Sequence, residues 1–207
     1  MRLMKIIGIT GPSGAGKSLL SAAFQKLSIP CIDADGVYHS LLVPPSSCLD
    51  ALKKAFGNDI FAFDGSLDRA ALRNIVFSDE EKLRLLNSTV LSFVLDKTRK
   101  MIAELEKAGH EVVAFDAPTL IESGFNVECD TVISVLAPAD VRLERIMKRD
   151  GISKEAAMLR INAQKQDEFY ISHSDGILIN DGSPEQLEKE LASLLRERGF
   201  MTGGTDG

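Results

Sequence analysis

The sequence predicts an α/β fold in which a parallel five-stranded sheet carries helices on both faces. Five short apolar segments rich in Val and Ile alternate with longer stretches whose apolar residues recur at helical spacing. The chain has 207 residues, which is enough for one such domain with an insertion. Alternation of this kind predicts a parallel sheet buried on both faces.

The predicted strands share a short length and β-branched residues, and they lie at residues 6–10, 30–32, 111–116, 131–136 and 176–180. Residues 111–116 and 131–136 are almost wholly apolar inside, as is typical of strands buried on two faces. Residues 61–66 contain Asp-Gly and predict a small hairpin.

Apolar residues at helical spacing predict helices at residues 17–27, 49–56, 69–77, 79–108, 139–149, 153–165 and 183 to about 198. The helical stretch between the second and third strands is longer than a simple crossover. The sequence therefore predicts a single unit with four parts: a core at about 1–34, 111–138 and 174–200, a substrate-binding insertion at about 35–110, a helical lid at about 139–170, and a flexible tail at 201–207.

Composition excludes several classes of protein. A net charge of −6 argues against broad nucleic-acid binding, which needs a basic face. The cysteines are far apart and form no C-x-x-C pair, so no disulfide framework or zinc site is indicated and a reducing cytosol fits. No apolar stretch approaches the roughly 18 residues of a membrane-spanning helix, and the N-terminal run is too short for a signal peptide. We expect a cytoplasmic protein without nucleic-acid or membrane partners, monomeric by default, with an oligomer left open as the alternative.

The stretch GPSGAGKS at residues 11–18 matches the phosphate-binding pattern G-x-x-x-x-G-K-[ST], after a strand and before a helix. Glycines let backbone N–H groups converge on phosphate oxygens, and the helix N-terminus adds more donors. In this pattern Lys17 reaches the β- and γ-phosphates of ATP, and the Ser18 hydroxyl is a ligand for Mg²⁺. The predicted nucleotide-binding residues are Gly11, Pro12, Ser13, Gly14, Ala15, Gly16, Lys17, Ser18 and Leu19.

Other nucleotide-binding classes fit the sequence less well. The dinucleotide fingerprint G-x-G-x-x-G lacks its third glycine, because Leu19 occupies that position. A switch GTPase usually has an N-K-x-D motif, which the chain does not contain, and an ATPase motor is usually larger. The sequence therefore favours a kinase that phosphorylates a small molecule, which needs an acceptor pocket, a group that orients the hydroxyl, and cations on the transferring phosphoryl group.

Acidic residues follow the second and third strands. Asp33 stands at the carboxyl end of the second strand, where it could accept the proton of an acceptor hydroxyl or bind Mg²⁺ through water. The alternative is that Asp33 or Asp35 caps the next helix. Asp116 ends an apolar strand and is assigned to the substrate site beside Mg²⁺, or else it only starts a turn. His39 is a candidate for contact with a substrate phosphate, ahead of His110 and His173.

Arg142, Arg145 and Arg149 have spacings that place them on one helix face. Guanidinium groups match phosphate oxygens, and a lid that carries them would close over ATP and exclude water. We assign catalytic roles to Arg145 and Arg149, together with Lys17 and Asp33. The alternative for each arginine is a solvated helix face.

Several stretches together resemble the dephospho-coenzyme A kinase family. They are GITGPSGAGKS at 8–18, DADGVYH at 33–39, LDRAALRNIVFSD at 67–79, LLN at 85–87, DAPTLIESG at 116–124, RLERIMKRDGIS at 142–153, RINAQ at 160–164 and ILINDG at 177–182. The resemblance implies a three-layer P-loop kinase of the nucleoside monophosphate kinase-like fold. It also implies that ATP and Mg²⁺ are used to phosphorylate the ribose 3′-hydroxyl of dephospho-CoA.

The resemblance also implies roles for single residues. Asp33 is then the base on the 3′-hydroxyl, and Asp35, His39 and Arg69 lie near dephospho-CoA. Asn180 lies near the adenine of ATP. Two other functions remain open: a kinase of the same fold that acts on a nucleoside, a nucleoside monophosphate or a sugar acid, and an ATP-binding regulatory module without transfer activity.

Overall fold

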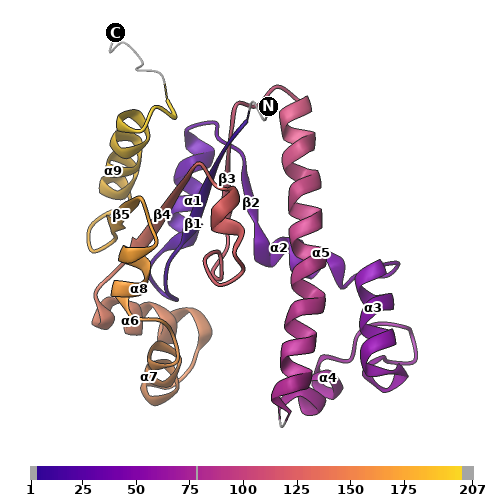
Figure 1. Cartoon of the computed structure of the whole chain (residues 1–207). Coiled ribbons are helices and arrows are strands. Elements are labelled where there is room, and N and C mark those ends of the chain that lie inside the picture. Colours follow the sequence, from indigo (N-terminus) through magenta and orange to yellow (C-terminus); the bar gives the residue numbers. More distant parts are fainter. Residues whose placement is uncertain (1–3, 78, 202–207) are drawn as a thin grey trace. The chain divides into compact units, whose positions relative to one another are not determined.

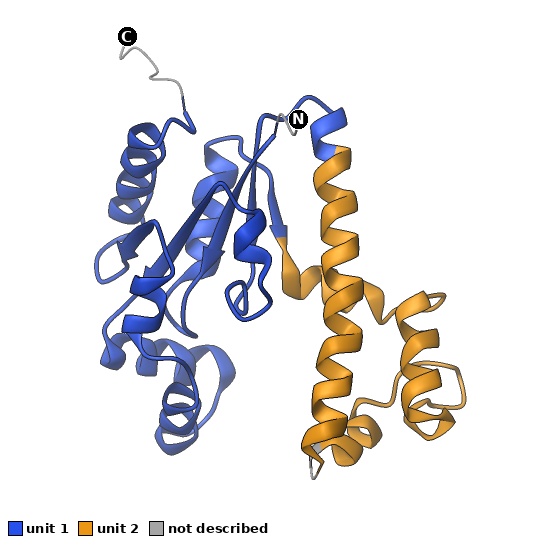
Figure 2. Ribbon diagram, viewed as in Figure 1, with its two compact units in different colours: residues 1–32, 105–207 blue, residues 33–104 orange. Residues whose placement is uncertain are grey.

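The computed structural model describes residues 4–77 and 79–201 of the chain (Figure 1). The chain forms two compact units: residues 1–32 with 105–207 make unit 1, and residues 33–104 make unit 2 (Figure 2). Each unit has a hydrophobic core of its own.

Unit 1 is built on a five-stranded parallel sheet with the strand order β2-β3-β1-β4-β5. The strands are β1 (Lys5–Thr10), β2 (Cys31–Asp33), β3 (Val112–Asp116), β4 (Thr131–Leu136) and β5 (Gly176–Ile179). Their positions confirm the predicted α/β fold and fall within two residues of the predicted bounds. Because the strands are parallel, the loops after β1, β3, β4 and β5 leave from the same edge of the sheet.

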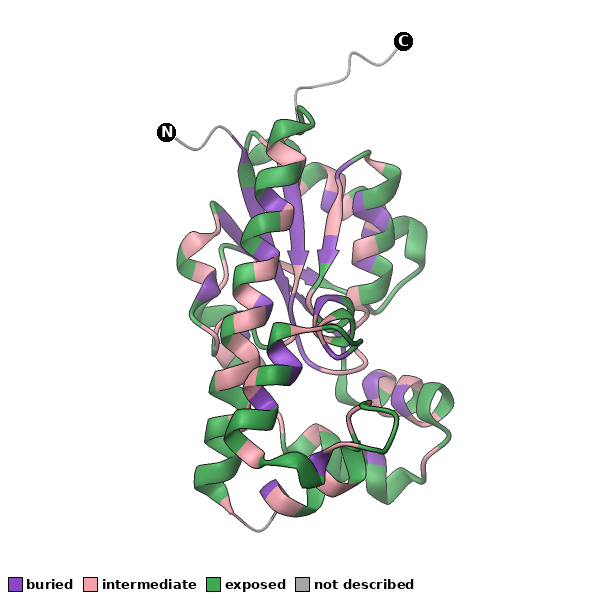
Figure 3. Cartoon of the chain, turned by 90° about the vertical axis from the view of Figure 1, so that its right-hand side faces the viewer, coloured by how far each residue is buried: buried purple, intermediate pink, exposed green. Residues whose placement is uncertain are grey.

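Both faces of the sheet are covered, which leaves the strands buried (Figure 3). Helices α1 (Lys17–Lys26) and α9 (Pro184–Glu197) pack on one face, where Leu20, Phe24 and Leu191 join the core. On the other face, Phe125 in the short helix η2 (Phe125–Glu128) makes an edge-on contact with Phe115 of β3, with ring centroids 4.8 Å apart. The near-continuous apolar strands seen in the sequence are explained by this two-sided burial.

Three helices follow β4: α6 (Ala139–Asp150), α7 (Lys154–Asn162) and α8 (Asp167–Ser172). The predicted helix at 153–165 is wrong in its extent, because α7 ends at Asn162 and a separate helix α8 begins at Asp167. No glycine or proline marks this break in the sequence. The Gln164 side chain instead bonds to the backbone of Ser13, 151 residues away in the chain.

Unit 2 is helical. It contains α2 (Ala34–Leu41), α3 (Ser47–Phe56), η1 (Asn58–Ile60), α4 (Arg69–Phe77) and most of α5 (Glu80–Lys107). The α4 helix has the predicted bounds, and α5 is within one residue of them. The predicted hairpin at 61–66 is closed by a single antiparallel bridge between Phe61 and Leu67. Leu49, Leu52, Ile60 and Leu72 lie in the core of this unit.

The C-terminal end differs from the prediction at one residue. Met201 is half-buried and packs against the core of unit 1, so the predicted flexible tail does not include it. Residues 202–207 of the predicted tail lie outside the described residues. No helix among the described residues combines the length and apolar composition needed to cross a membrane.

Candidate active site

The loop between β1 and α1 forms a tight cradle of backbone. Gly11 has φ 139° and Gly16 has φ 108°, and both values favour glycine. A Cβ atom added to Gly11 would lie 2.2 Å from the carbonyl oxygen of Val135, and one added to Gly16 would lie 1.9 Å from Asn180 Nδ2. Glycine is therefore required at both positions, because neighbouring atoms leave no room for a Cβ atom and because the backbone conformation favours glycine.

Helix α1 begins at Lys17, directly after the cradle. Its N-cap residue Gly16 has no side chain to accept from the first backbone N–H groups, and the first turn contains no acidic residue. The positive end of the helix dipole is thus available to an anion. Lys17 is half-buried, and its Nζ donates to the Gly11 carbonyl oxygen at 2.8 Å, so the side chain folds back over the loop. Ser18 is exposed in the first turn of the helix.

Asp116 ends β3, and its Cα pairs in register with Ile9 near the end of β1. Its Oδ2 accepts a hydrogen bond of 2.7 Å from Ser21 Oγ, one turn beyond Lys17 on α1. This bond fixes the carboxylate against the helix that follows the phosphate loop. Ser21 has no signal in the sequence, because Ser on a helix face is most often a solvated residue.

Arg142 of α6 is a buried clamp on the phosphate loop. Its side chain is 6% exposed, and its Nε donates to the carbonyl oxygen of Ser13 at 3.1 Å. Its Nη2 donates to Gln164 Oε1 at 3.0 Å, and the same oxygen accepts from the Ser13 backbone N–H at 3.1 Å. Asp167 lies 3.7 Å from Nη1. Burial lowers the pKa of Arg142, and the charge of Asp167 opposes this shift.

Arg145 reaches the same loop one helical turn later. Its Nη1 donates to the carbonyl oxygens of Gly14 at 3.3 Å and Asn180 at 3.2 Å. Asn180 is buried after β5, and its Nδ2 donates to the Ala15 carbonyl oxygen at 2.8 Å. Asn180 is therefore placed by the structure against the phosphate loop, together with Arg145. Sequence reasoning without the family resemblance gives no signal for it.

Arg149 is exposed, and its Nη2 donates to the Ser13 hydroxyl at 3.3 Å. Its Nε donates to Asp150 Oδ1 at 2.7 Å, and Arg160 of α7 pairs with the other oxygen of the same carboxylate. The hydrogen bond from Arg149, followed by the charges of both arginines, lowers the pKa of Asp150 to about 2. Asp150 stays ionised at neutral pH and holds both guanidinium groups on this side of the loop.

We expect Arg142→Ala to lower the free energy of unfolding by about 2 kcal/mol, because Ser13 and Gln164 lose a charged hydrogen-bond partner inside the protein. Urea unfolding followed by circular dichroism measures the change. Arg84→Ala is the control, because Arg84 forms an exposed ion pair with Glu80 on the same helix. Equal unfolding midpoints for the two variants would contradict the conclusion that Arg142 stabilises the phosphate loop.

In unit 2, Asp33 caps α2. Its Oδ1 accepts from the Asp35 N–H at 3.0 Å, and its Oδ2 accepts from the Gly36 N–H at 3.1 Å. Of the two residues considered as caps from the sequence, Asp33 is therefore the one that caps the helix. A carboxylate has about four lone-pair positions, so two remain available to a further donor. The capping bonds hold the carboxylate at the end of β2.

His39 and Arg69 come together within unit 2. Arg69 is the first residue of α4, and its Nη2 lies 3.3 Å from His39 Nδ1 on α2. Asp35 is one helical turn before His39 and so shares its face of α2. All three side chains belong to exposed residues, and the structure thus gathers two of the predicted acceptor-site residues directly. His110 is also exposed, and His173 Nδ1 contacts the Phe169 carbonyl oxygen at 2.8 Å, which is a local contact at the end of α8.

Near the phosphate loop, the atoms that could bind a metal ion are oxygen atoms of isolated side chains. Within residues 4–77 and 79–201, no group of three or more His, Cys, Asp or Glu side chains is arranged to hold a metal ion. The phosphate loop itself is braced by three arginines, Gln164 and Asn180. This arrangement can hold an anionic polyphosphate against backbone N–H groups in a fixed geometry.

Comparison with known proteins identifies the family of the chain. A family model described as dephospho-CoA kinase matches residues 5–186. The dephospho-CoA kinase of Carboxydothermus hydrogenoformans is 35% identical over 197 residues, covering 95% of this chain and 96% of that protein. The crystal structure of TT1252 from Thermus thermophilus is 33% identical with a TM-score of 0.79 and covers 98% of this chain and 100% of that one.

The dephospho-CoA kinase from Campylobacter jejuni is 26% identical with a TM-score of 0.69, and the match covers 95% of this chain and 98% of that one. Matches of this length include the phosphate loop, the α2–α4 segment and the helices that follow β4. The resemblance inferred from the motifs is confirmed, and the chain belongs to the dephospho-CoA kinase family.

Proposed function

We propose that this protein transfers the γ-phosphoryl group of ATP to the ribose 3′-hydroxyl of dephospho-CoA. The observation that carries the proposal is the family match to residues 5–186, a span that includes both the phosphate loop and the segment from Asp33 to Arg69. Family membership implies the use of ATP and a small-molecule acceptor. The names of the relatives supply the class of acceptor.

The residues of unit 1 fit a nucleotide polyphosphate with Mg²⁺. The cradle is lined by backbone that a Cβ atom at Gly11 or Gly16 would obstruct. The Ser18 hydroxyl and the Asp116 carboxylate offer oxygen atoms, which Mg²⁺ prefers as ligands. When bound, Mg²⁺ supplies positive charge to the phosphate oxygens. Asn180 and Arg145 are assigned to the nucleotide side of the site because both contact the loop.

The proposed reaction is an in-line displacement. The 3′-oxygen of the acceptor attacks the γ-phosphorus, the bond from this phosphorus to the β,γ-bridging oxygen breaks, and ADP leaves. Asp33 accepts the proton of the hydroxyl. Lys17 leaves the Gly11 carbonyl oxygen to bind the β- and γ-phosphates, and Arg145 and Arg149 stabilise charge on the transferring group.

The acceptor side of the proposal rests on Asp35, His39 and Arg69. The Arg69 guanidinium is a bidentate donor suited to the diphosphate of dephospho-CoA, and its contact with His39 orients it from α2. Asp35 lies on the same face of that helix, where a carboxylate can accept from ribose or adenine donors.

An acceptor panel tests the proposed function. We expect ADP release with dephospho-CoA at a kcat/KM roughly 10²-fold above that with AMP, CMP or gluconate. The 3′-deoxy analogue of dephospho-CoA is the matched control, because it keeps every other group and should give no ADP above background. Preference for another acceptor would assign a different kinase activity to the chain. ATP binding without acceptor-dependent ADP release from any compound would indicate a regulatory module.

A further inference from the structure

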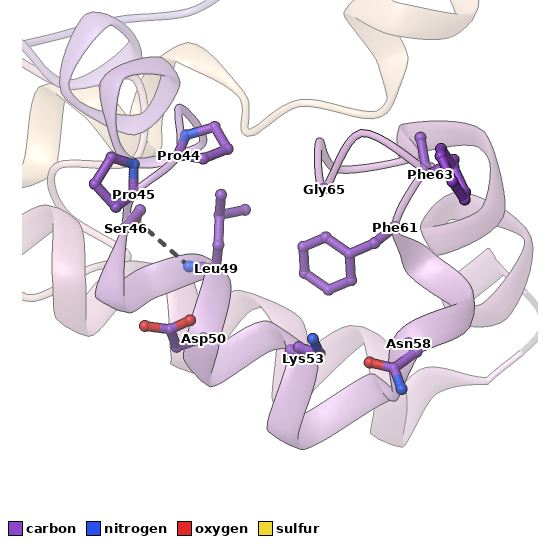
Figure 4. A pocket seen from close by; sticks show the side chains of 11 residues that line it. Pro44, Pro45, Ser46, Leu49, Asp50, Lys53, Asn58, Phe61, Phe63 and Gly65 are labelled. Atoms are coloured by element: carbon purple, nitrogen blue, oxygen red, sulfur yellow. Dashed lines mark hydrogen bonds between the residues drawn. The ribbon is translucent and has the colours of Figure 1, made fainter.

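A cavity of about 480 Å³ lies entirely within unit 2, between the start of α3 and the hairpin that follows η1 (Figure 4). Its apolar lining comprises the rings of Pro44, Pro45, Phe61 and Phe63 and the side chain of Leu49. Its polar lining includes Asp50, Lys53 and Asn58. The volume falls within the range of small-molecule sites.

One wall of the cavity is formed by the solvent-exposed aromatic ring of Phe63. Phe63 is fully exposed, whereas Leu49 opposite it is 5% exposed and Phe61 packs against the core of unit 2. Figure 4 shows Phe61 pointing across the cavity toward Leu49. A single exposed ring is ordinary, but this ring lines a cavity and stands at the tip of a hairpin.

The hairpin that carries Phe63 is held by a set of hydrogen bonds. The Ala62 N–H donates to the Ser66 carbonyl oxygen at 2.9 Å, and the Gly65 N–H donates back to the Ala62 carbonyl oxygen at 3.0 Å. Asp64 Oδ1 accepts from both the backbone N–H and the hydroxyl of Ser66 at 2.9 and 2.6 Å. The ring is therefore presented by an ordered turn and not by a loose strand end.

The polar side chains of the cavity are open to a ligand. The structure gives Asp50, Lys53 and Asn58 no side-chain hydrogen bond or ion pair with any described residue. They provide one anion, one cation and one amide that both donates and accepts. This combination of apolar rings with an amide suits a ligand that alternates aliphatic carbon with amide groups.

The cavity is connected to the acceptor-site residues by the chain itself. The residues that line it belong to the segment between His39 and Arg69. Arg69 Nη2 lies 3.3 Å from His39 Nδ1, and this contact joins the two ends of the segment. The Asp68 N–H donates to the Ile60 carbonyl oxygen at 2.8 Å, which ties the start of α4 to the residue before Phe61. Arg69 and the aromatic wall thus belong to one hydrogen-bonded assembly.

We propose that this cavity binds the pantetheine arm of the acceptor, with Phe63 as an apolar flap over the arm. The inference rests on the proposed function and extends it, since dephospho-CoA is an adenosine diphosphate joined to an arm of methyl, amide and thiol groups. Arg69 and His39 hold the diphosphate, the rings of Phe61 and Phe63 contact the aliphatic part, and Asn58 pairs with an arm amide. The cavity is then the part of the site that distinguishes dephospho-CoA from an acceptor without an arm.

Calorimetric titration tests this assignment, with the nucleotide site saturated by the non-hydrolysable analogue AMP-PNP. The two titrants are dephospho-CoA and ADP-ribose, which shares the adenosine diphosphate half and lacks the arm. We expect Phe63→Ala to raise the Kd of dephospho-CoA about tenfold and to leave that of ADP-ribose within about twofold. Phe63→Tyr keeps the ring and should bind like the unchanged protein. Leu85→Ala is the matched control, because Leu85 is an exposed apolar residue of α5 outside the cavity.

Every other result would contradict the proposal that this cavity binds the pantetheine arm. Unchanged binding of dephospho-CoA by Phe63→Ala would place the arm elsewhere, and an equal loss for both titrants would place Phe63 on the nucleotide half. A dimer of the unchanged protein that Phe63→Ala converts to monomer, measured by sedimentation, would assign the ring to contact between copies. Failure of the proposed function is distinguishable, because the unchanged protein would then release no ADP with dephospho-CoA.

Discussion

Lys17→Ala is expected to lower kcat for phosphoryl transfer by about 10³-fold or more. The ammonium group of Lys17 is held beside the phosphate cradle by its bond to the Gly11 carbonyl oxygen. In the proposed reaction this charge stabilises negative charge that develops on the β- and γ-phosphates, and neither the helix dipole nor backbone N–H groups carry a full charge to replace it. A coupled assay of ADP release with saturating ATP and acceptor measures the loss.

The fold of the Lys17→Ala variant should remain intact. Lys17 is half-buried at the start of α1, and its hydrogen bond to the neutral Gly11 carbonyl is worth about 1 kcal/mol. Alanine is the residue that a helix tolerates best, so the first turn of α1 should persist. Circular dichroism and the midpoint of thermal unfolding should therefore stay near those of the unchanged protein.

Lys26→Ala is the matched control on the same helix. Lys26 lies in the last turn of α1 and forms an exposed ion pair with Glu188 of α9. Its removal takes the same charge from the same helix at the end remote from the phosphate loop, so kcat should be unchanged. A near-normal rate for Lys17→Ala, or an equal loss for both variants, would show that the assignment of the loop is wrong.

The phosphate loop could be predicted from the sequence because its chemistry depends on local spacing. The positions of Gly11, Gly16 and Lys17 follow from how backbone N–H groups converge and how a lysine reaches over them, and all of this happens within eight residues. The strands were predictable for a related reason, since burial on both faces selects continuous apolar runs. The structure adds the physical limits on the glycines, at Val135 and Asn180.

The contacts that the α6 arginines and Gln164 make with the phosphate loop could not be predicted in the same way. Helical spacing placed Arg142, Arg145 and Arg149 on one face but left open whether that face is solvated. In the structure, the exposure of these side chains increases along the helix. Arg142 is buried and Arg149 is exposed, although all three arginines contact the loop. The partner Gln164 is 151 residues from Ser13 in sequence, and a bond over that separation depends on the tertiary fold.

Asp33→Asn is expected to lower kcat by roughly 10²- to 10⁴-fold while the Kd of ATP stays nearly unchanged. An asparagine amide cannot accept the proton of the acceptor hydroxyl, whereas the proposed nucleotide site consists of unit 1 residues that this change leaves intact. Single-turnover measurement of product formation gives the rate of the chemical step, and titration with AMP-PNP gives the affinity for nucleotide.

The capping bonds of Asp33 make this test sharper than an alanine substitution would be. Asparagine is among the favoured N-cap residues, and its Oδ1 can still accept from the Asp35 N–H. Asp33→Asn therefore removes the proposed base and retains the capping bond from the Asp35 N–H, while the bond from the Gly36 N–H loses its acceptor. Asp33→Ser should behave in the same way, because a serine hydroxyl also caps a helix and is no base at neutral pH.

Asp79→Asn is the matched control for the structural role. Asp79 caps α5 in the same unit through Oδ1, which accepts from the N–H groups of Glu81 and Lys82 at 3.0 Å each. Asparagine keeps the single oxygen that accepts both bonds at position 79 but only one of the two acceptors at position 33, so both unfolding midpoints should shift by small amounts, with the larger shift for Asp33→Asn. Only the change at Asp33 should lower kcat. If Asp33→Asn loses stability but keeps kcat, as Asp79→Asn does, Asp33 is a helix cap alone, and the proton of the 3′-hydroxyl must leave by way of another group or water.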